Sequence, residues 1–116
     1  MLAIGEDFAV VCADAIPDSA RRRAVLDELE GTGHAIVEIG VDEMNGFAGN
    51  LLALRSRGGE PLIAGSDAAW LALAPEKRRQ LERHGAVVSA AIPTIERRGG
   101  GSVRCMIAEI FLPRNA

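Results

Sequence analysis

The residues best suited to chemistry lie near the C-terminal end of the 116-residue chain, around one cysteine, Cys105. Its neighbours are three consecutive glycines and two polar residues: Gly99, Gly100, Gly101, Ser102 and Arg104. The glycine run lacks the spacing and the Lys-Ser/Thr ending of a phosphate-binding loop. We expect Ser102 to cap a short turn, where backbone N–H groups and Arg104 favour the thiolate that a nucleophilic cysteine needs. The alternative is that Cys105 is a small buried residue leading into a strand.

Five other residues bear on the same chemistry. A cysteine nucleophile usually needs a histidine, but His34 and His84 are interpreted as structural or solvated because no carboxylate pattern near them would orient them. Cys12 lies within an apolar run and is expected in the core. Asn50 fits either a turn or an amide that reaches into a pocket at a strand mouth. Glu96 is either a surface or pairing residue or a residue that holds the glycine loop.

Composition limits the class of protein. The net charge is −3 and 48% of the residues are apolar, so a core can form and a basic nucleic-acid-binding face is not indicated. The two cysteines and two histidines show no zinc-ligand spacing, and we expect no metal and no cofactor. The first residues lack the features of a signal peptide, and no apolar run approaches the roughly 18 residues of a membrane span. These observations favour a cytoplasmic protein that binds neither nucleic acid nor membrane.

The elements that must position these residues form a repeat. We expect strands, from their apolar runs, over residues 2–4, 8–13, 34–39, 51–54, 61–64 and 86–90. A helix is expected to start at Asp18 or Ser19 and to bury Val25, Leu26 and Leu29. Two more helices are expected before the last of these strands. The first begins at Ser66-Asp67, and the second runs from Pro75 to His84 with Gly85 as its cap.

Both halves of the chain thus have the order strand, strand, helix, strand. We predict an α/β fold in a single partial domain, with modules at residues 1–40 and 50–91 and a nucleophile segment at 92–116 that ends in a strand over Met106–Leu112. A period near forty residues is typical of propellers, whose modules bury their faces against neighbours. Two modules leave an open side, so we expect either a homo-oligomer or a missing N-terminal portion.

The run from Glu96 to Met106, with its Gly-Gly-Gly-Ser-Val-Arg-Cys sequence, resembles the nucleophile segment of the guanidino-group-modifying enzymes. These are the arginine deiminases, dimethylarginine dimethylaminohydrolases and amidinotransferases. Residues 107–113 and 43–50 look most like the amidinotransferase-like or citrulline-utilisation hydrolase branch. The resemblance covers essentially the whole chain. It implies a pentein-type α/β propeller of five strand-strand-helix-strand modules around a central active site.

The same resemblance implies a mechanism. Cys105 would attack the guanidinium carbon of an arginine-like compound, an amine or ammonia would leave, and water or a second amine would release the product from a thiouronium intermediate. Asn50, Ser102 and Arg104 are expected to contact the substrate. Neither histidine matches the family's catalytic histidine, and its substrate-binding carboxylates have no match. We therefore expect a C-terminal portion of the enzyme that is inactive alone.

Two other functions remain open at this point. One is a non-catalytic, self-associating α/β module in which Cys105 is structural. The other is a thiol redox or sensor role for Cys105. The sequence also leaves hydrolase and transferase chemistry undecided, because both begin with the same attack by the thiolate.

Overall fold

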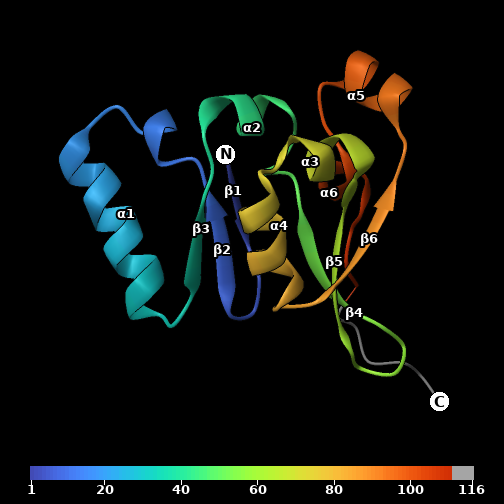
Figure 1. Ribbon diagram of the computed structural model, residues 1–116, viewed down its shortest axis with the longest axis horizontal. Coiled ribbons are helices and arrows are strands. Elements are labelled where there is room, and N and C mark those ends of the chain that lie inside the picture. The colour runs from blue at the N-terminus through green and yellow to red at the C-terminus, as the bar shows by residue number, and fades with distance from the viewer. Residues whose placement is uncertain (111–116) are drawn as a thin grey trace.

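The computed structural model describes residues 1–110 and contains two three-stranded sheets that lie side by side with helices packed around them (Figure 1). The first sheet is built from β1 (Leu2–Ile4), β2 (Phe8–Val11) and β3 (Ala35–Glu38). β1 and β2 form an antiparallel hairpin, whereas β3 runs parallel to β2. A parallel neighbour needs a crossover connection, and α1 (Ser19–Gly31) supplies it.

The helix α1 begins and ends for reasons visible in the sequence. The side chain of Asp18 accepts a hydrogen bond from the backbone N–H of Arg21 at 2.8 Å, which caps the first turn. Leu29 is buried and Val25 and Leu26 are half-buried, so the expected apolar stripe is confirmed. β2 is shorter than the predicted strand 8–13, because the chain turns after Val11 into the 3-10 helix η1 (Ala13–Ala15).

The second sheet repeats this arrangement. It contains β4 (Leu52–Arg55), β5 (Pro61–Ser66) and β6 (Ala86–Ala90), with β4 antiparallel and β6 parallel to β5. The crossover from β5 to β6 consists of α3 (Asp67–Ala72) and α4 (Pro75–Glu82). The predicted start of α4 at Pro75 is confirmed, but its cap is Arg83 and not Gly85, because the N–H of Arg83 already bonds back to the last turn.

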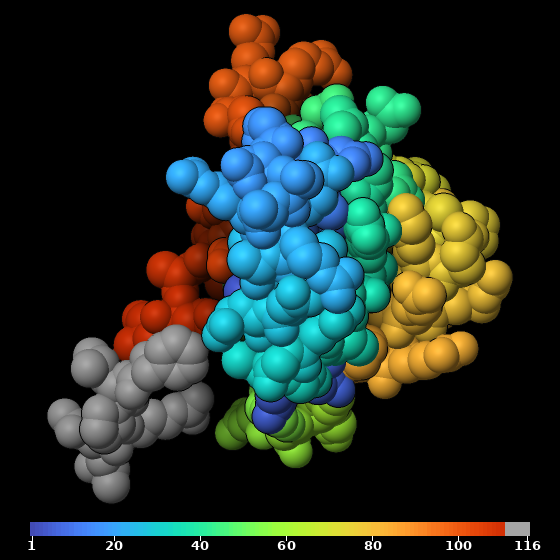
Figure 2. Space-filling model, turned by 90° about the vertical axis from the view of Figure 1, so that its left-hand side faces the viewer, coloured from blue at the N-terminus to red at the C-terminus, as the bar shows by residue number. Residues whose placement is uncertain are grey.

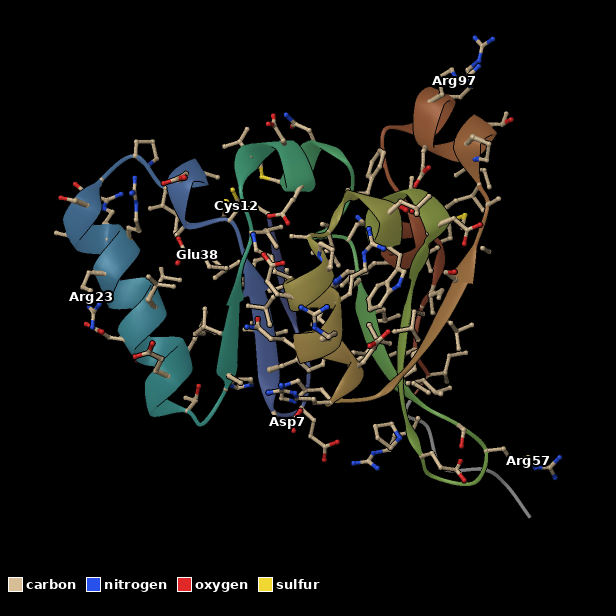
Figure 3. All side chains as sticks on the ribbon, viewed as in Figure 1. Asp7, Cys12, Arg23, Glu38, Arg57 and Arg97 are labelled. Carbon is tan, nitrogen blue, oxygen red and sulfur yellow. The ribbon has the colours of Figure 1, made fainter. Side chains whose placement is uncertain are left out.

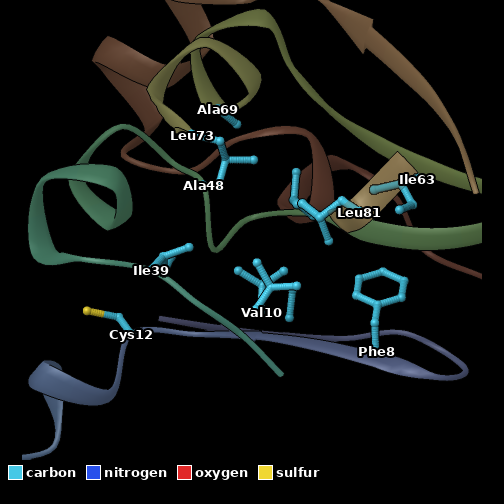
Figure 4. Packing of buried hydrophobic residues seen from close by; sticks show 12 residues of the cluster. Phe8, Val10, Cys12, Ile39, Ala48, Ile63, Ala69, Leu73 and Leu81 are labelled. Carbon is cyan, nitrogen blue, oxygen red and sulfur yellow. The ribbon is translucent and has the colours of Figure 1, made fainter. Parts of the chain in front are cut away.

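One apolar core joins the two sheets. Side chains from β2, β5 and α4 face one another across it, among them Val10, Ile63 and Leu81 (Figure 4). β1 contacts β4, and α4 contacts β3 of the other sheet. Cys12 is fully buried in this core beyond the end of β2, so its predicted core position is confirmed. The short helix α2 (Val41–Asn45) connects β3 to the second sheet.

The C-terminal segment differs from the prediction. α5 (Pro93–Gly99) and α6 (Val103–Met106) are helices, and α6 contains Cys105. Residues 107–110 form no strand, so the strand expected over Met106–Leu112 is wrong for its described part, and its last two residues lie outside the described range. The apolar composition of 106–112 suggested a strand, but Met106, Ile107 and Ile110 are exposed and pair with no neighbouring strand.

From the side, α1 forms the outer surface beyond the first sheet, and the segment of α5 projects at one end of the molecule (Figure 2). Within residues 1–110, no helix combines the length and the apolar character needed to cross a membrane.

Candidate active site

Asn50 is held at the point where the chain enters the second sheet. After α2 the chain turns at Phe47, whose φ of 69° is in the left-handed region, and the N–H of Asn50 donates to the carbonyl of Phe47 at 2.8 Å. Ala48 and Leu51 on either side are buried in the core. The backbone of Asn50 is therefore fixed by its neighbours, and its amide side chain is left to reach toward α6.

Asn50 and Cys105, which are 55 residues apart in the sequence, meet through that amide. Asn50 Nδ2 donates a hydrogen bond to Cys105 Sγ at 3.1 Å. The other end of the same amide, Oδ1, accepts from the backbone N–H of Arg104 at 3.0 Å. The second bond fixes the orientation of the amide, because only its oxygen can accept from an N–H. A donor therefore faces the sulfur.

This arrangement favours the thiolate. The hydrogen bond from Asn50 lowers the pKa of the Cys105 thiol, a backbone hydrogen bond at Ser102 and the positive charge of Arg104 lower it further, and slight burial opposes them. Cys105 is exposed, so the reactive form is accessible to a ligand in solution. Accessible thiols with a lowered pKa are the reactive cysteines of proteins, whereas buried structural ones such as Cys12 are inert.

Two glycines permit the approach of the loop to this thiol. Gly100 caps α5 in the left-handed conformation, with φ of 68°, which costs glycine little and other residues more. A Cβ at Gly101 would lie 3.0 Å from both Cβ and Sγ of Cys105. Gly99 has open space around it. The run therefore serves two distinct needs, a left-handed cap and a close approach to the sulfur.

Ser102 stands at the start of α6, as expected, but its side chain does not cap the helix. Its hydroxyl donates instead to Glu96 Oε1 at 2.7 Å, and both residues are buried. Of the two interpretations of Glu96, the structure thus supports the one in which it holds the glycine loop. The structure brings Asn50, Ser102, Arg104 and Gly101 together around Cys105, whereas no contact to the thiol is found at Gly99 or Gly100.

Glu43 was not predicted to have a role, yet its side chain stabilises the segment that leads to Asn50. Its carboxylate accepts from the N–H groups of Gly40 at 2.8 Å and Ala74 at 3.0 Å, and it pairs with Lys77. Burial raises the pKa of Glu43, but these hydrogen bonds and the charge of Lys77 outweigh it and lower the pKa overall. The pattern Val41-Asp42-Glu43 offers only a weak signal, an acidic residue in a first helical turn.

The two histidines lie elsewhere. His34 Nδ1 is 2.9 Å from Thr32 Oγ1. The ring of His84 packs against that of Phe8 at a tilt of 37°. Its Nδ1 is 3.0 Å from Asp7 Oδ1, which makes an ion pair when the ring is protonated but does not have hydrogen-bond geometry. A carboxylate therefore does lie beside His84, contrary to the interpretation from sequence. Asp7 is at the end of the sheets opposite α2 (Figures 1 and 3).

His84 and Asp7 line a cavity of ≈ 360 Å³ between the hairpin ends of the two sheets. Its other charged groups, Glu6 and Arg55, form an ion pair with each other. Because these charges are already paired and the residues lining the cavity do not include Cys105, the candidate active site is the Asn50–Cys105 pair.

Comparison with known families gives the class of protein. A family model described as N,N dimethylarginine dimethylhydrolase, eukaryotic, matches residues 1–112. The match lies within the superfamily of guanidino-modifying pentein enzymes, so the predicted class of protein is confirmed. The chain belongs to the N,N dimethylarginine dimethylhydrolase family. Enzymes of this family are hydrolases that act on C–N bonds. No curated protein and no solved structure matches the chain.

Proposed function

We propose that Cys105 is the nucleophile of an enzyme that hydrolyses the guanidino group of methylated arginines. The observation that carries the proposal is the orientation of the Asn50 amide, which donates to Sγ at 3.1 Å while its oxygen is held by the N–H of Arg104. The family gives the reaction class, a hydrolysis of C–N bonds.

In the proposed reaction the Cys105 thiolate adds to the guanidinium carbon and forms a C–S bond. The C–N bond to the dimethylamino group then breaks as its nitrogen takes up a proton from solvent, and dimethylamine leaves. Water adds to the resulting thiouronium carbon and gives up its two protons to solvent, the C–S bond breaks, and the thiolate is regenerated with a ureido product. Asn50 supports both halves of the cycle because its N–H stabilises the sulfur anion before attack and again on release.

The residues beside Cys105 have separate proposed roles in binding. The exposed guanidinium of Arg104 suits the carboxylate of an amino-acid substrate, since arginine binds carboxylates through two parallel hydrogen bonds. The hydroxyl of Ser102 is buried and donates to Glu96, so it is not free to bind substrate. We therefore assign the substrate contacts to Asn50 and Arg104.

The experiment measures release of dimethylamine from asymmetric dimethylarginine by the protein at its natural length. We expect Cys105→Ala to abolish turnover while the matched Cys12→Ala variant retains it, because Cys12 is buried in the core. Turnover that survives Cys105→Ala contradicts the nucleophile. Turnover of arginine with ammonia release, and none of dimethylarginine, contradicts the substrate.

We further propose that the two sheets are modules of a propeller, at residues 1–40 and 50–91, and that the chain associates with copies of itself. Apolar side chains exposed on β6 and after α6, such as Val88 and Ile110, support association. Sedimentation tests the self-association. A concentration-dependent shift toward a dimer is expected, and a monomer at all concentrations refutes the association.

A further inference from the structure

Glu96 is a carboxylate in an unusual position. Its neighbours Arg97 and Arg98 on α5 are exposed, whereas Glu96 is only 9% exposed. Burying a carboxylate is costly unless hydrogen bonds compensate it. The compensation comes from Ser102, itself 0% exposed, whose hydroxyl donates to Oε1 at 2.7 Å. A buried polar pair of this kind specifies one geometry, because breaking the bond leaves a buried donor and a buried acceptor unsatisfied.

Glu96 also closes the glycine loop with its backbone. Its carbonyl accepts from the N–H of Gly100 at 3.1 Å, while its side chain reaches Ser102. One residue therefore holds the loop at two points. The three glycines on their own would give this segment wide conformational freedom. The two bonds from Glu96 restrict that freedom.

Because Ser102 is hydrogen-bonded to Cys105, holding Ser102 in place also holds the thiol in place. The carbonyl of Ser102 accepts from the N–H of Cys105 at 3.0 Å, so the position of Ser102 sets the position of the first turn of α6. That turn places Sγ against Asn50 Nδ2 and the N–H of Arg104 against Asn50 Oδ1. Because the helix has only four residues, its own hydrogen bonds do little to hold it.

We propose that Glu96 is a positioning residue, which acts through Ser102 to hold Cys105 at hydrogen-bonding distance from Asn50. This inference rests on the proposed role of Cys105 as the nucleophile. The inference concerns the position of the thiol, and the reactivity of the thiol reports that position without any turnover.

The test is the pH dependence of alkylation of Cys105 by iodoacetamide. In Glu96→Ala we expect the apparent pKa of the thiol to rise and the alkylation rate at neutral pH to fall on the order of tenfold, because misplacement by a fraction of an ångström weakens the bond to Asn50. Glu96→Gln keeps an oxygen that accepts from Ser102 and should restore the wild-type profile. Arg97→Ala, an exposed neighbour on the same helix, is the matched control and should leave it unchanged.

Ser102→Ala should reproduce the effect of Glu96→Ala, and the double variant should be no worse than either single one, because both remove the same bond. If Glu96→Ala does not fold, the alkylation profile of Ser102→Ala tests the positioning role in its place. A wild-type alkylation profile in Glu96→Ala or Ser102→Ala overturns the proposal, even if unfolding shows lower stability. A shifted profile in a protein whose turnover survives Cys105→Ala supports the positioning role and refutes the nucleophile, so the two failures are distinguishable.

Discussion

Replacing Gly101 by alanine probes how closely the glycine loop approaches the thiol. The added methyl carbon would lie 3.0 Å from both Cβ and Sγ of Cys105. A contact this short is tighter than nearly all real Cβ contacts, so the loop and α6 must separate by a few tenths of an ångström. Such a separation would stretch the Asn50–Cys105 hydrogen bond, and since a shift of about 1 Å at a reacting group can lower a rate on the order of 100-fold, this smaller shift is expected to cost about tenfold.

The assay compares kcat/KM for dimethylarginine and the alkylation rate of Cys105 in Gly101→Ala and Gly99→Ala. A Cβ at Gly99 would meet nothing within 4 Å, so alanine there changes the same loop without touching the thiol. We expect both rates to fall by about tenfold in Gly101→Ala and to stay near wild type in Gly99→Ala. Equal rates in the two variants would refute the reasoning.

Three further predictions concern the thiol, the loop and the core. Asn50→Ala should raise the pKa of the Cys105 thiol, which shifts its alkylation profile to higher pH, and an unchanged profile would refute this. The pKa of Glu43 is lowered on folding, so its stabilisation is present above the unfolded-state value of about 4.3 and is lost as pH falls below it. Urea unfolding of Glu43→Gln should therefore show a weaker loss of stability in acid than wild type, and parallel curves would contradict the assignment. Leu73→Ala should lower the free energy of unfolding by about 2–5 kcal/mol, because the residue is 1% exposed, and Leu71→Ala, 70% exposed, by less than about 0.5 kcal/mol.

Much of the α/β repeat could be predicted because its signals are local. Asp18 caps α1, Pro75 begins α4, and the apolar runs before residue 91 correspond to the strands of the two sheets. These features depend on residues within a few positions of each other. The C-terminal segment misleads by the same kind of signal, since residues 106–112 are as apolar as a strand, but their described part, residues 106–110, pairs with no strand.

The site was predictable in its residue types and not in its contacts. Cys105 and the glycine run can be singled out from the sequence by their residue types alone, and the family resemblance added Asn50. The bond between them spans 55 residues, and no local pattern encodes that distance. Glu96 was ambiguous because an acidic residue next to two arginines is typical of a solvated helix face, and only the fold shows that it points inward to Ser102.

The measurement that tests the central claim most directly is covalent labelling by 2-chloroacetamidine, a small mimic of a guanidinium group, followed by intact mass and peptide mapping. If Cys105 is a nucleophile for guanidino carbons, one equivalent is incorporated at Cys105 and none at Cys12, and dimethylarginine slows the labelling. Labelling that is equal at the two cysteines, or that dimethylarginine leaves unaffected, would contradict the account.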